Sequence, residues 1–532
     1  MPEQAAEISL WSGKDTSLRQ KLLFIKSAFD DCAVNHPECK PLRNHYPGRL
    51  IDVGDEARNP RLIETSNRIL QGASYATLSH CWGSVHSSTA TVKNIKQLCK
   101  EIPLDSLPLT FREAILVTRE LNIPYIWIDS LCILQDDRED WSKEANKMKY
   151  TYSSSAITIS ALDAENCTYG CFVKPDSDIF SSVRKRAQVT QFSAPVLGTH
   201  VPMQIRVQGG DIRHPQRAIL RTRGWTLQEE LLSHREIACM RPEIRWRCQR
   251  AQITEAGHVL EGTGTGKGNC WTQHGSLRMS RGELSQLWCG KMNNYSSREF
   301  TFEQDMLSAL VGVVDHFGKR TGYTHVLASW RETMIDDLLW IRLRRDIAEL
   351  RTPIYGIPSW SWLTRAKCVD FDCWKVGLAA GDENISKDHT TVVEVGSEWA
   401  GEPMLSAIVN IHLVLEGPMK RMRLRVDPRA RDFNPPYLNV GDEEPDLGEN
   451  PLPWRCAGQF DRENVREDEM FTCILMRSAW RAGRRDGDFL LETFLMLLPE
   501  QEEGVFRRVG LGTFRSGETL FGDAESKKIR LV

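Results

Sequence analysis

The sequence predicts an α/β fold between Ser74 and Ala161, with a parallel sheet and helices on its faces. Strand-like and helix-like segments alternate there as YATLSH, LTFREAILVTRELN, PYIWID, DREDWSKEANKMKYTY and AITISAL, and strands separated by helices pair in parallel. The two inner strands are apolar at nearly every position, as strands covered on both faces are.

The other elements of the N-terminal half follow from apolar periodicity and capping residues. Residues 16–33 are predicted to form a helix whose apolar face includes LLFIKSAF. Thr110, with Glu113 three residues later, is expected to cap the first helix between the strands, and Asp136 or Asp137 the second. Residues 170–214 are predicted to form strands and loops. Residues 223–249 read as a short helix followed by two strands around a turn at Arg241-Pro242.

The C-terminal half is predicted to be mixed, and then rich in strands. Residues 299–317 and 329–350 have helical periodicity, the residues after PSWSW (358–362) alternate as strands do, and 427–453 is a long loop or linker. The expected organisation is an N-terminal helical lead-in (1–70), the α/β domain (71–250), a mixed helical region that contains PSWSW (251–426), and a linker with a β-rich C-terminal region (427–532).

Composition excludes several classes of partner. The net charge of -3 arises from 68 basic and 71 acidic residues, so no overall field attracts nucleic acid, and no nucleic-acid partner is predicted. No run of 18 apolar residues occurs, so no membrane span is predicted. The 15 cysteines are scattered in a large chain, which is typical of reduced thiols. The N-terminal residues carry no signal-peptide pattern, and a cytoplasmic location is expected.

Unusual side chains follow two of the predicted strands. SHCWG (79–83) follows YATL, and Asp129-Ser130-Leu131-Cys132 follows YIWI. Ligands of parallel sheets bind at the carboxyl ends of strands, so these side chains would meet at one edge if the strands are neighbours. Cys81 and Cys132 also fit buried apolar positions. Asp129 fits either a structural or a functional role, because a carboxylate there needs a partner.

Two helical segments carry further candidates. Glu144, Met148 and Tyr152 lie four residues apart and share one stripe, which is also typical of a half-buried helix face. Gln228 and Glu229 are adjacent and point about 100° apart on a helix. Only one of the two can therefore face a given site.

Three other motifs are weaker. Cys32, His36 and Cys39 are zinc-type ligands, but a closed site needs a fourth and no paired Cys or His motif follows at finger spacing, so no metal site is predicted. EGTGTGKGN (261–269) does not match the phosphate-binding loop pattern. His80 and Cys81 do not fit a Cys-His hydrolase, since adjacent strand residues point to opposite faces.

Three blocks together resemble the fungal heterokaryon incompatibility (HET) domain. They are YATLSHCWG, the segment from LTFREAILVTRELN to AITISA, and RGWTLQEELLSHREI, in family order between about Ser74 and Ala238. The residues on which this resemblance rests are Trp82-Gly83, Trp127-Ile128-Asp129, Cys132-Ile133, Gln135-Asp136-Asp137, Trp141, Glu144, Met148, Tyr152, Arg223-Gly224-Trp225-Thr226 and Gln228-Glu229. The flanking segments RLID (49–52) and PSWSW (358–362) also resemble those that commonly surround this domain. One difference is His80, at a position where Tyr is more usual in the family.

The resemblance implies a function in fungal non-self recognition, as an effector that triggers death of incompatible fused cells. HET domains are in turn distantly similar to TIR domains, which implies a TIR-like or Rossmann-like sheet and hydrolysis of NAD at the nicotinamide-ribose bond. By that analogy Glu144 is the catalytic residue. NAD or a related nucleotide would then be the substrate, and no cofactor is implied. The residues expected to bind it are Ser79, His80, Cys81, Trp82, Gly83, Asp129, Cys132, Gln135, Trp141, Trp225, Gln228 and Glu229.

A second interpretation stays open at this point. The same motifs would also suit a non-catalytic death-effector module that acts by self-association or by binding a partner protein. Similarity to TIR domains implies a homo-oligomer, and the incompatibility partner is not identified by any motif.

Overall fold

The computed structural model describes a large part of the chain as two compact units, residues 1–278 and 279–532. The described residues are 18–41, 45–66, 70, 72–83, 88–172, 189–196, 199–206, 218–240, 244–255, 279–342, 356–364, 368–371, 386–426, 438–440, 456–461, 469–481 and 488–532. The Gly-rich segment 261–269 and most of the predicted linker 427–453 lie outside them.

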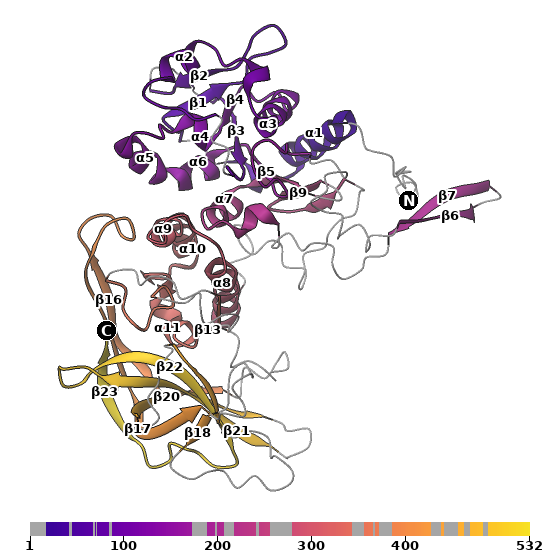
Figure 1. Cartoon of the computed structure of the whole chain (residues 1–532). Coiled ribbons are helices and arrows are strands. Elements are labelled where there is room, and N and C mark those ends of the chain that lie inside the picture. Colours follow the sequence, from indigo (N-terminus) through magenta and orange to yellow (C-terminus); the bar gives the residue numbers. More distant parts are fainter. Residues whose placement is uncertain are drawn as a thin grey trace. The chain divides into compact units, whose positions relative to one another are not determined.

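The N-terminal unit is built on an eight-stranded sheet with the order β10-β9-β8-β5-β3-β4-β1-β2 (Figure 1). Its four central strands run parallel, which confirms the predicted parallel sheet: β3 (Tyr75–Ser79), β4 (Tyr125–Trp127), β5 (Ile157–Ala161) and β8 (Arg235–Cys239). β3 and β5 are buried at every residue, which explains their continuous apolar sequence. The antiparallel edges are β1 (Arg49–Asp52), β2 (Arg61–Glu64), β9 (Arg245–Cys248) and β10 (Gln252–Thr254).

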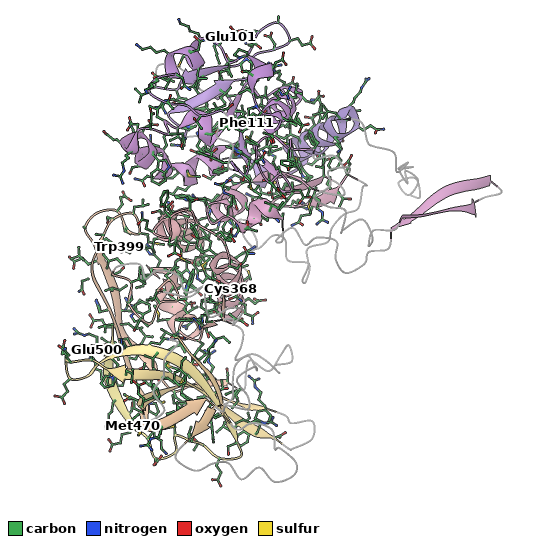
Figure 2. All side chains as sticks on the ribbon, viewed as in Figure 1. Glu101, Phe111, Cys368, Trp399, Met470 and Glu500 are labelled. Carbon is green, nitrogen blue, oxygen red and sulfur yellow. The ribbon has the colours of Figure 1, made fainter. Side chains whose placement is uncertain are left out.

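Helices flank this sheet, as Figure 1 shows. They are α1 (Leu18–Asn35), α2 (Ile95–Lys100), α3 (Leu109–Glu120), α4 (Asp129–Cys132), α5 (Arg138–Ala145), α6 (Met148–Ser154) and α7 (Thr226–Leu232). Short 3-10 helices lie at Pro37–Cys39 (η1), Leu104–Ser106 and Ile219–Thr222. Figure 2 shows Phe111 of α3 inside the unit and Glu101 at its surface.

Two local expectations are corrected. Thr110 does not cap α3, because Pro108 occupies the cap position. Instead, the Thr110 hydroxyl accepts the N–H of Gly170, and Glu113 accepts those of Cys171 and Phe172. The single helix expected over 137–152 is two helices, because α5 ends at Ala145 and α6 starts at Met148.

Other predictions for this unit are confirmed. Asp137 caps α5 by accepting the N–H groups of Glu139 and Asp140. The short helix and two strands expected over 223–249 are α7, β8 and β9. Part of 170–214 forms the antiparallel pair β6 (Val189–Val196) and β7 (Thr199–Arg206).

The C-terminal unit combines helices with a β-rich part. Its helices are α8 (Arg281–Ser296), α9 (Asp305–Ser308), α10 (Val311–Thr321) and α11 (Met334–Asp337). The helix expected over 329–350 was wrong in its described part, where β12 (Ser329–Trp330), a 3-10 turn, α11 and β13 (Ile341–Arg342) follow one another. Trp330 and Trp340 are buried there, so their spacing reflects burial and not one continuous helix.

The β-rich C-terminal prediction is confirmed. The strands are β15 (Ser386–Asp388), β16 (Thr391–Trp399), β17 (Ile408–Val426), β18 (Leu438–Val440), β19 (Cys456–Phe460), β20 (Met470–Arg481), β21 (Phe489–Pro499), β22 (Val505–Ser516) and β23 (Glu525–Leu531). Because β17 pairs with both β20 and β23, the pairings β17-β20-β21-β22-β23 close into a ring. Among the described helices, none is long and apolar enough to cross a membrane.

Candidate functional site

The residues that follow β3 and β4 meet at one edge of the sheet. The two strands are parallel neighbours, with Thr77 opposite Trp127, so both chains leave the sheet on the same side. The indole N–H of Trp82 donates a hydrogen bond to Asp129 Oδ2 over 2.9 Å, and Oδ1 of the same carboxylate accepts the backbone N–H of Ser130 at 2.7 Å. The expected meeting of the two strand ends is confirmed.

Helix α7 adds a second carboxylate to this edge. The hydroxyl of Ser79, the last residue of β3, donates a hydrogen bond to Glu229 Oε2. Glu229 is only 7% exposed. Burial raises its pKa to about 7, and the nearby charge of Asp129 acts in the same direction, while the hydrogen bond from Ser79 and the charge of Arg223 oppose the rise. The Ser79 hydroxyl is therefore hydrogen-bonded to a carboxyl group, that of Glu229, whose pKa is close to neutral pH.

His80 is held neutral inside the cluster. Its ring packs edge-on against Phe111 at 5.0 Å, and Nδ1 lies 3.8 Å from Asp129 Oδ1. Burial lowers the pKa of His80 to about 4, although the charge of Asp129 works against this. The Arg223 guanidinium donates to the His80 carbonyl over 2.6 Å, so the RGWT block fixes the backbone of the strand-end loop.

The side chain of Tyr152, on α6, interacts with the Glu229 carboxylate. Burial raises the pKa of its hydroxyl well above the ordinary value, and the charge of Glu229 adds to this effect. Tyr152 and Arg223 lie in the sequence blocks that resemble the HET domain but were not among the predicted site residues. The signal that pointed to them was their position in two of the three recognised blocks.

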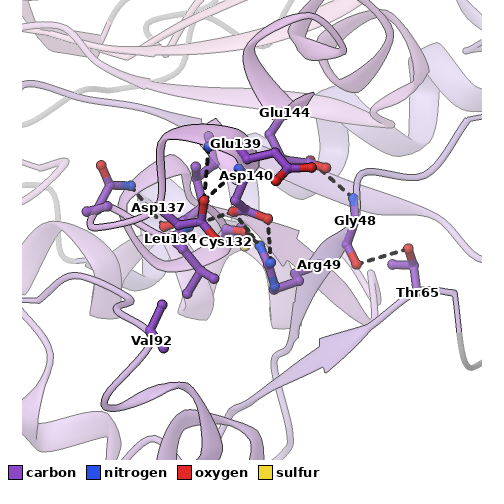
Figure 3. Close-up of polar contacts among 12 residues, drawn as sticks. Gly48, Arg49, Thr65, Val92, Cys132, Leu134, Asp137, Glu139, Asp140 and Glu144 are labelled. Carbon is purple, nitrogen blue, oxygen red and sulfur yellow. Dashed lines mark hydrogen bonds and ion pairs between the residues drawn. The ribbon is translucent and has the colours of Figure 1, made fainter. Parts of the chain in front are cut away.

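Among the described residues, the Glu144 side chain contacts Gly48 and Lys147 and not the residues that follow β3 and β4 (Figure 3). Its carboxylate accepts the N–H of Gly48 at 3.2 Å and is 3.5 Å from Lys147 Nζ. A Cβ placed on Gly48 would be 2.7 Å from Glu144 Oε1, so a glycine suits this close approach. The contacts of Glu144 join α5 to the segment that leads into β1.

The neighbouring Asp140 explains what α5 does in this region. Its carboxylate binds Arg49 in a bidentate manner, at 2.6 and 3.0 Å, and also accepts the N–H of Leu134 at 2.8 Å. Arg49 additionally donates to the Cys132 carbonyl over 2.8 Å. This network, drawn in Figure 3, ties β1 to the turn after α4.

The remaining predicted residues surround the cluster or lie away from it. Gly83 has a φ of +68° and a Cβ there would be 2.2 Å from Asn166 Cβ, so the SHCWG loop requires glycine at this turn. Gln135 donates to the carbonyls of Asp129 and Ile133. Cys81, Cys132 and Gln228 are buried, and burial raises the pKa of both thiols. Trp141 is 41% exposed and meets Trp225 edge-on at 6.3 Å.

The structure therefore brings together only part of the predicted set. We call Ser79, His80, Trp82, Asp129 and Glu229 the strand-end cluster. It spans β3, the start of α4 and α7, and it holds two carboxylates, one of them partly open to solvent, since the Asp129 side chain is 25% exposed. Such a set can bind a polar ligand and exchange a proton with it.

The strand-end cluster lies within a segment that matches a known family. Residues 75–229 match the family described as heterokaryon incompatibility protein (HET). The matched segment runs from the start of β3 to Glu229 and contains the whole strand-end cluster. It confirms the resemblance to HET domains over this segment and suggests a role in heterokaryon incompatibility. No curated protein and no solved structure matches the chain.

Proposed function

We propose that the HET segment is the cytoplasmic effector of a fungal non-self recognition reaction, and that it triggers cell death by hydrolysing NAD or a related nucleotide. The supporting observation is the pair of carboxylates, Asp129 and Glu229, beside Ser79 and Trp82 at the carboxyl ends of parallel strands. Ligands of parallel α/β sheets bind at this edge.

The first step needs an anion close to the ribose. Breaking the bond between nicotinamide and ribose builds an oxocarbenium-like charge on the sugar, as in glycoside hydrolysis. The nitrogen takes the bonding electrons, and nicotinamide leaves as a neutral molecule, so no acid is required. Asp129, the more exposed carboxylate of the cluster, would stabilise this charge. Trp82, oriented by its hydrogen bond to Asp129, offers a face on which a flat ring can stack.

The second step needs a base. Water forms the new bond to the ribose carbon and loses a proton, which Ser79 can pass to Glu229 through the hydrogen bond they share. A base works best when its pKa lies near the working pH, and the pKa of Glu229 is about 7. The contacts of Glu144 with Gly48 and Lys147 favour a positioning role for that residue, although the resemblance to TIR domains assigns it the catalytic one.

One experiment separates these assignments. NAD is incubated with the purified full chain, and released nicotinamide is measured by chromatography for the wild type and for Asp129→Asn, Glu229→Gln and Glu144→Gln. Asp136→Asn is the matched control, because the Asp136 carboxylate accepts the N–H of Val92 and, among the described residues, makes no contact with the cluster. We expect release by the wild type, the control and Glu144→Gln. We expect about a 100-fold loss or more in the other two variants.

The other outcomes are equally informative. Loss in Glu144→Gln alone would return the catalytic role to that residue and contradict our assignment. A folded wild-type protein that releases no nicotinamide would reject the enzyme.

The second candidate is a non-catalytic module that acts by self-association. The observation in its favour is Trp141, a large aromatic side chain that is 41% exposed on α5 and edge-on to Trp225. Exposed aromatic residues are enriched at protein interfaces. Under this function, Trp141→Ala would abolish both the oligomer and cell killing in a fungal host, while the cellular NAD level would stay constant during killing by the wild type.

A further inference from the structure

A second chemical cluster lies in the N-terminal unit, and its residues flank the HET match on both sides. Cys32 is in the last turn of α1, His36 and Cys39 are at η1, and Cys248 ends β9. One ligand atom from each of the four lies within 4.8 Å of all the others. The sequence offered only three ligands near the N-terminus, and the fold supplies the fourth from residue 248.

We propose that Cys32, His36, Cys39 and Cys248 bind one structural zinc ion. Three thiolates and one imidazole form a common closed zinc site. In a tetrahedral site with Zn–S bonds near 2.3 Å, two sulfurs are separated by about 3.8 Å. The observed spacing suits that geometry, and Cys248 Sγ lies 3.5 Å from His36 Nδ1. The three cysteines are buried, as the ligands of a closed site are.

The backbone around these residues holds the ligands in place. The His36 N–H bonds to the Cys32 carbonyl and the Cys39 N–H to that of His36, so the first three ligands lie on one continuous, hydrogen-bonded turn. Ala251 donates its N–H to Cys248 Sγ at 3.3 Å while the Cys248 N–H bonds to Ala251 in return. A backbone N–H aimed at the sulfur stabilises a thiolate, which is the form that binds metal.

The charge of the surroundings fits a metal thiolate centre. Zinc with three thiolates and a neutral imidazole has a net charge of -1 by formal charge counting. Arg235 is buried, and its Nε donates to Cys32 Sγ over 3.1 Å. Its other contacts are the Ala156 carbonyl and the Phe29 ring, and none within the described part of the chain is a carboxylate. The zinc centre would therefore provide the anionic partner that this buried guanidinium needs.

The identity of the metal follows from the ligands. Sulfur-rich tetrahedral sites with one imidazole select zinc over the hard cations, which prefer oxygen. All four coordination positions are filled by the protein, which is typical of structural and not catalytic zinc. The ion would join α1 and η1 to β9, and so close the chain around the matched segment 75–229.

The test measures metal in the full chain, purified under reducing conditions from zinc-containing medium without chelating steps. Elemental analysis is done on the wild type, Cys39→Ser, Cys248→Ser and the matched control Cys239→Ser, which changes a buried cysteine on the neighbouring strand β8. We expect about one zinc per chain in the wild type and the control. We expect loss of most of the zinc in the two ligand variants, and a lower Tm of the wild type after chelation.

A second measurement keeps the test decisive if the ligand variants do not fold. The wild type is stripped of zinc and titrated with Co²⁺, which should give thiolate-to-cobalt absorption and the visible bands of a tetrahedral site, with saturation at about one Co²⁺ per chain. A folded, reduced wild type that binds neither zinc nor cobalt would overturn the proposal. Full retention of zinc in Cys248→Ser, or a native disulfide between two of the three cysteines, would also overturn it.

Discussion

The pH dependence of stability gives a direct test of how Glu229 is buried. Its pKa is raised from the ordinary 4.5 to about 7 in the folded protein. In the unfolded chain the group ionises as the pH passes about 4.5, whereas in the folded chain it stays protonated until the pH approaches 7. Ionisation therefore costs the folded state nothing below 4.5, an increasing amount between the two values, and the full amount above 7.

The magnitude follows from that difference in pKa. At 1.36 kcal/mol for each pKa unit, the cost reaches about 3 kcal/mol above pH 7. Glu229→Gln keeps the shape of the side chain and an oxygen that can accept the Ser79 hydroxyl, but it cannot ionise. The free energy of unfolding of Glu229→Gln minus that of the wild type should therefore rise by about 3 kcal/mol between pH 4 and pH 8.

Urea unfolding of the full chain at a series of pH values measures this difference. A constant offset from the altered hydrogen bonds does not affect the result, because only the change with pH is read. Glu165→Gln, at an exposed position, is the matched control and should show little change. Ser79→Ala should move the midpoint for Glu229 to higher pH, since the Ser79 hydrogen bond lowers its pKa. A flat difference between pH 4 and 8 would refute the account of a desolvated carboxyl group.

Three further substitutions test the packing that supports the two units, each by urea unfolding. Arg49→Ala should destabilise the protein by about 2–3 kcal/mol, because it leaves the half-buried carboxylate of Asp140 without its bidentate partner; an effect near that of a surface pair would contradict this. Gly83→Ala should cost about 2 kcal/mol or more, given the positive φ and a Cβ 2.2 Å from the nearest side-chain atom; a neutral effect would show that the loop adopts another turn. Arg508→Ala should cost about 3–5 kcal/mol, since its fully buried side chain pairs with a carboxylate at 3.0 Å; a loss under 1 kcal/mol would contradict burial of that pair.

The sequence predicted the strands at the centre of the sheet more successfully than the elements around it. β3 and β5 are buried on both faces, so every residue carries the apolar signal. β1 and β2 are four-residue strands whose inner two residues alone are buried, and so short a pattern does not stand out. The expected helix after Ser329 failed because buried apolar residues such as Trp330 and Trp340 can also belong to short strands and a single helical turn.

The candidate site was predictable to the extent that it depends on strand ends. Trp82 and Asp129 follow adjacent parallel strands, and the rule that such ends share an edge was sufficient to bring them together. The partnership of Ser79 with Glu229 joins residues 150 positions apart, and periodicity could not choose between Gln228 and Glu229. Cys248 was missed for the same reason, since a ligand far along the chain leaves no spacing motif near the other three.

The segment that carries the family match is not by itself the structural unit. The match spans 75–229, yet its strand β4 pairs with β1 and its strand β5 pairs with β8, both outside those limits. Without them, two edges of a buried parallel sheet would expose unpaired backbone groups. The flanks also act near the site, because Arg49 of β1 holds both Asp140 and the Cys132 carbonyl at the end of α4, the helix that begins with Asp129. We therefore propose that the flanking strands, together with the proposed zinc site, fix the sheet and so hold the strand-end cluster in one geometry.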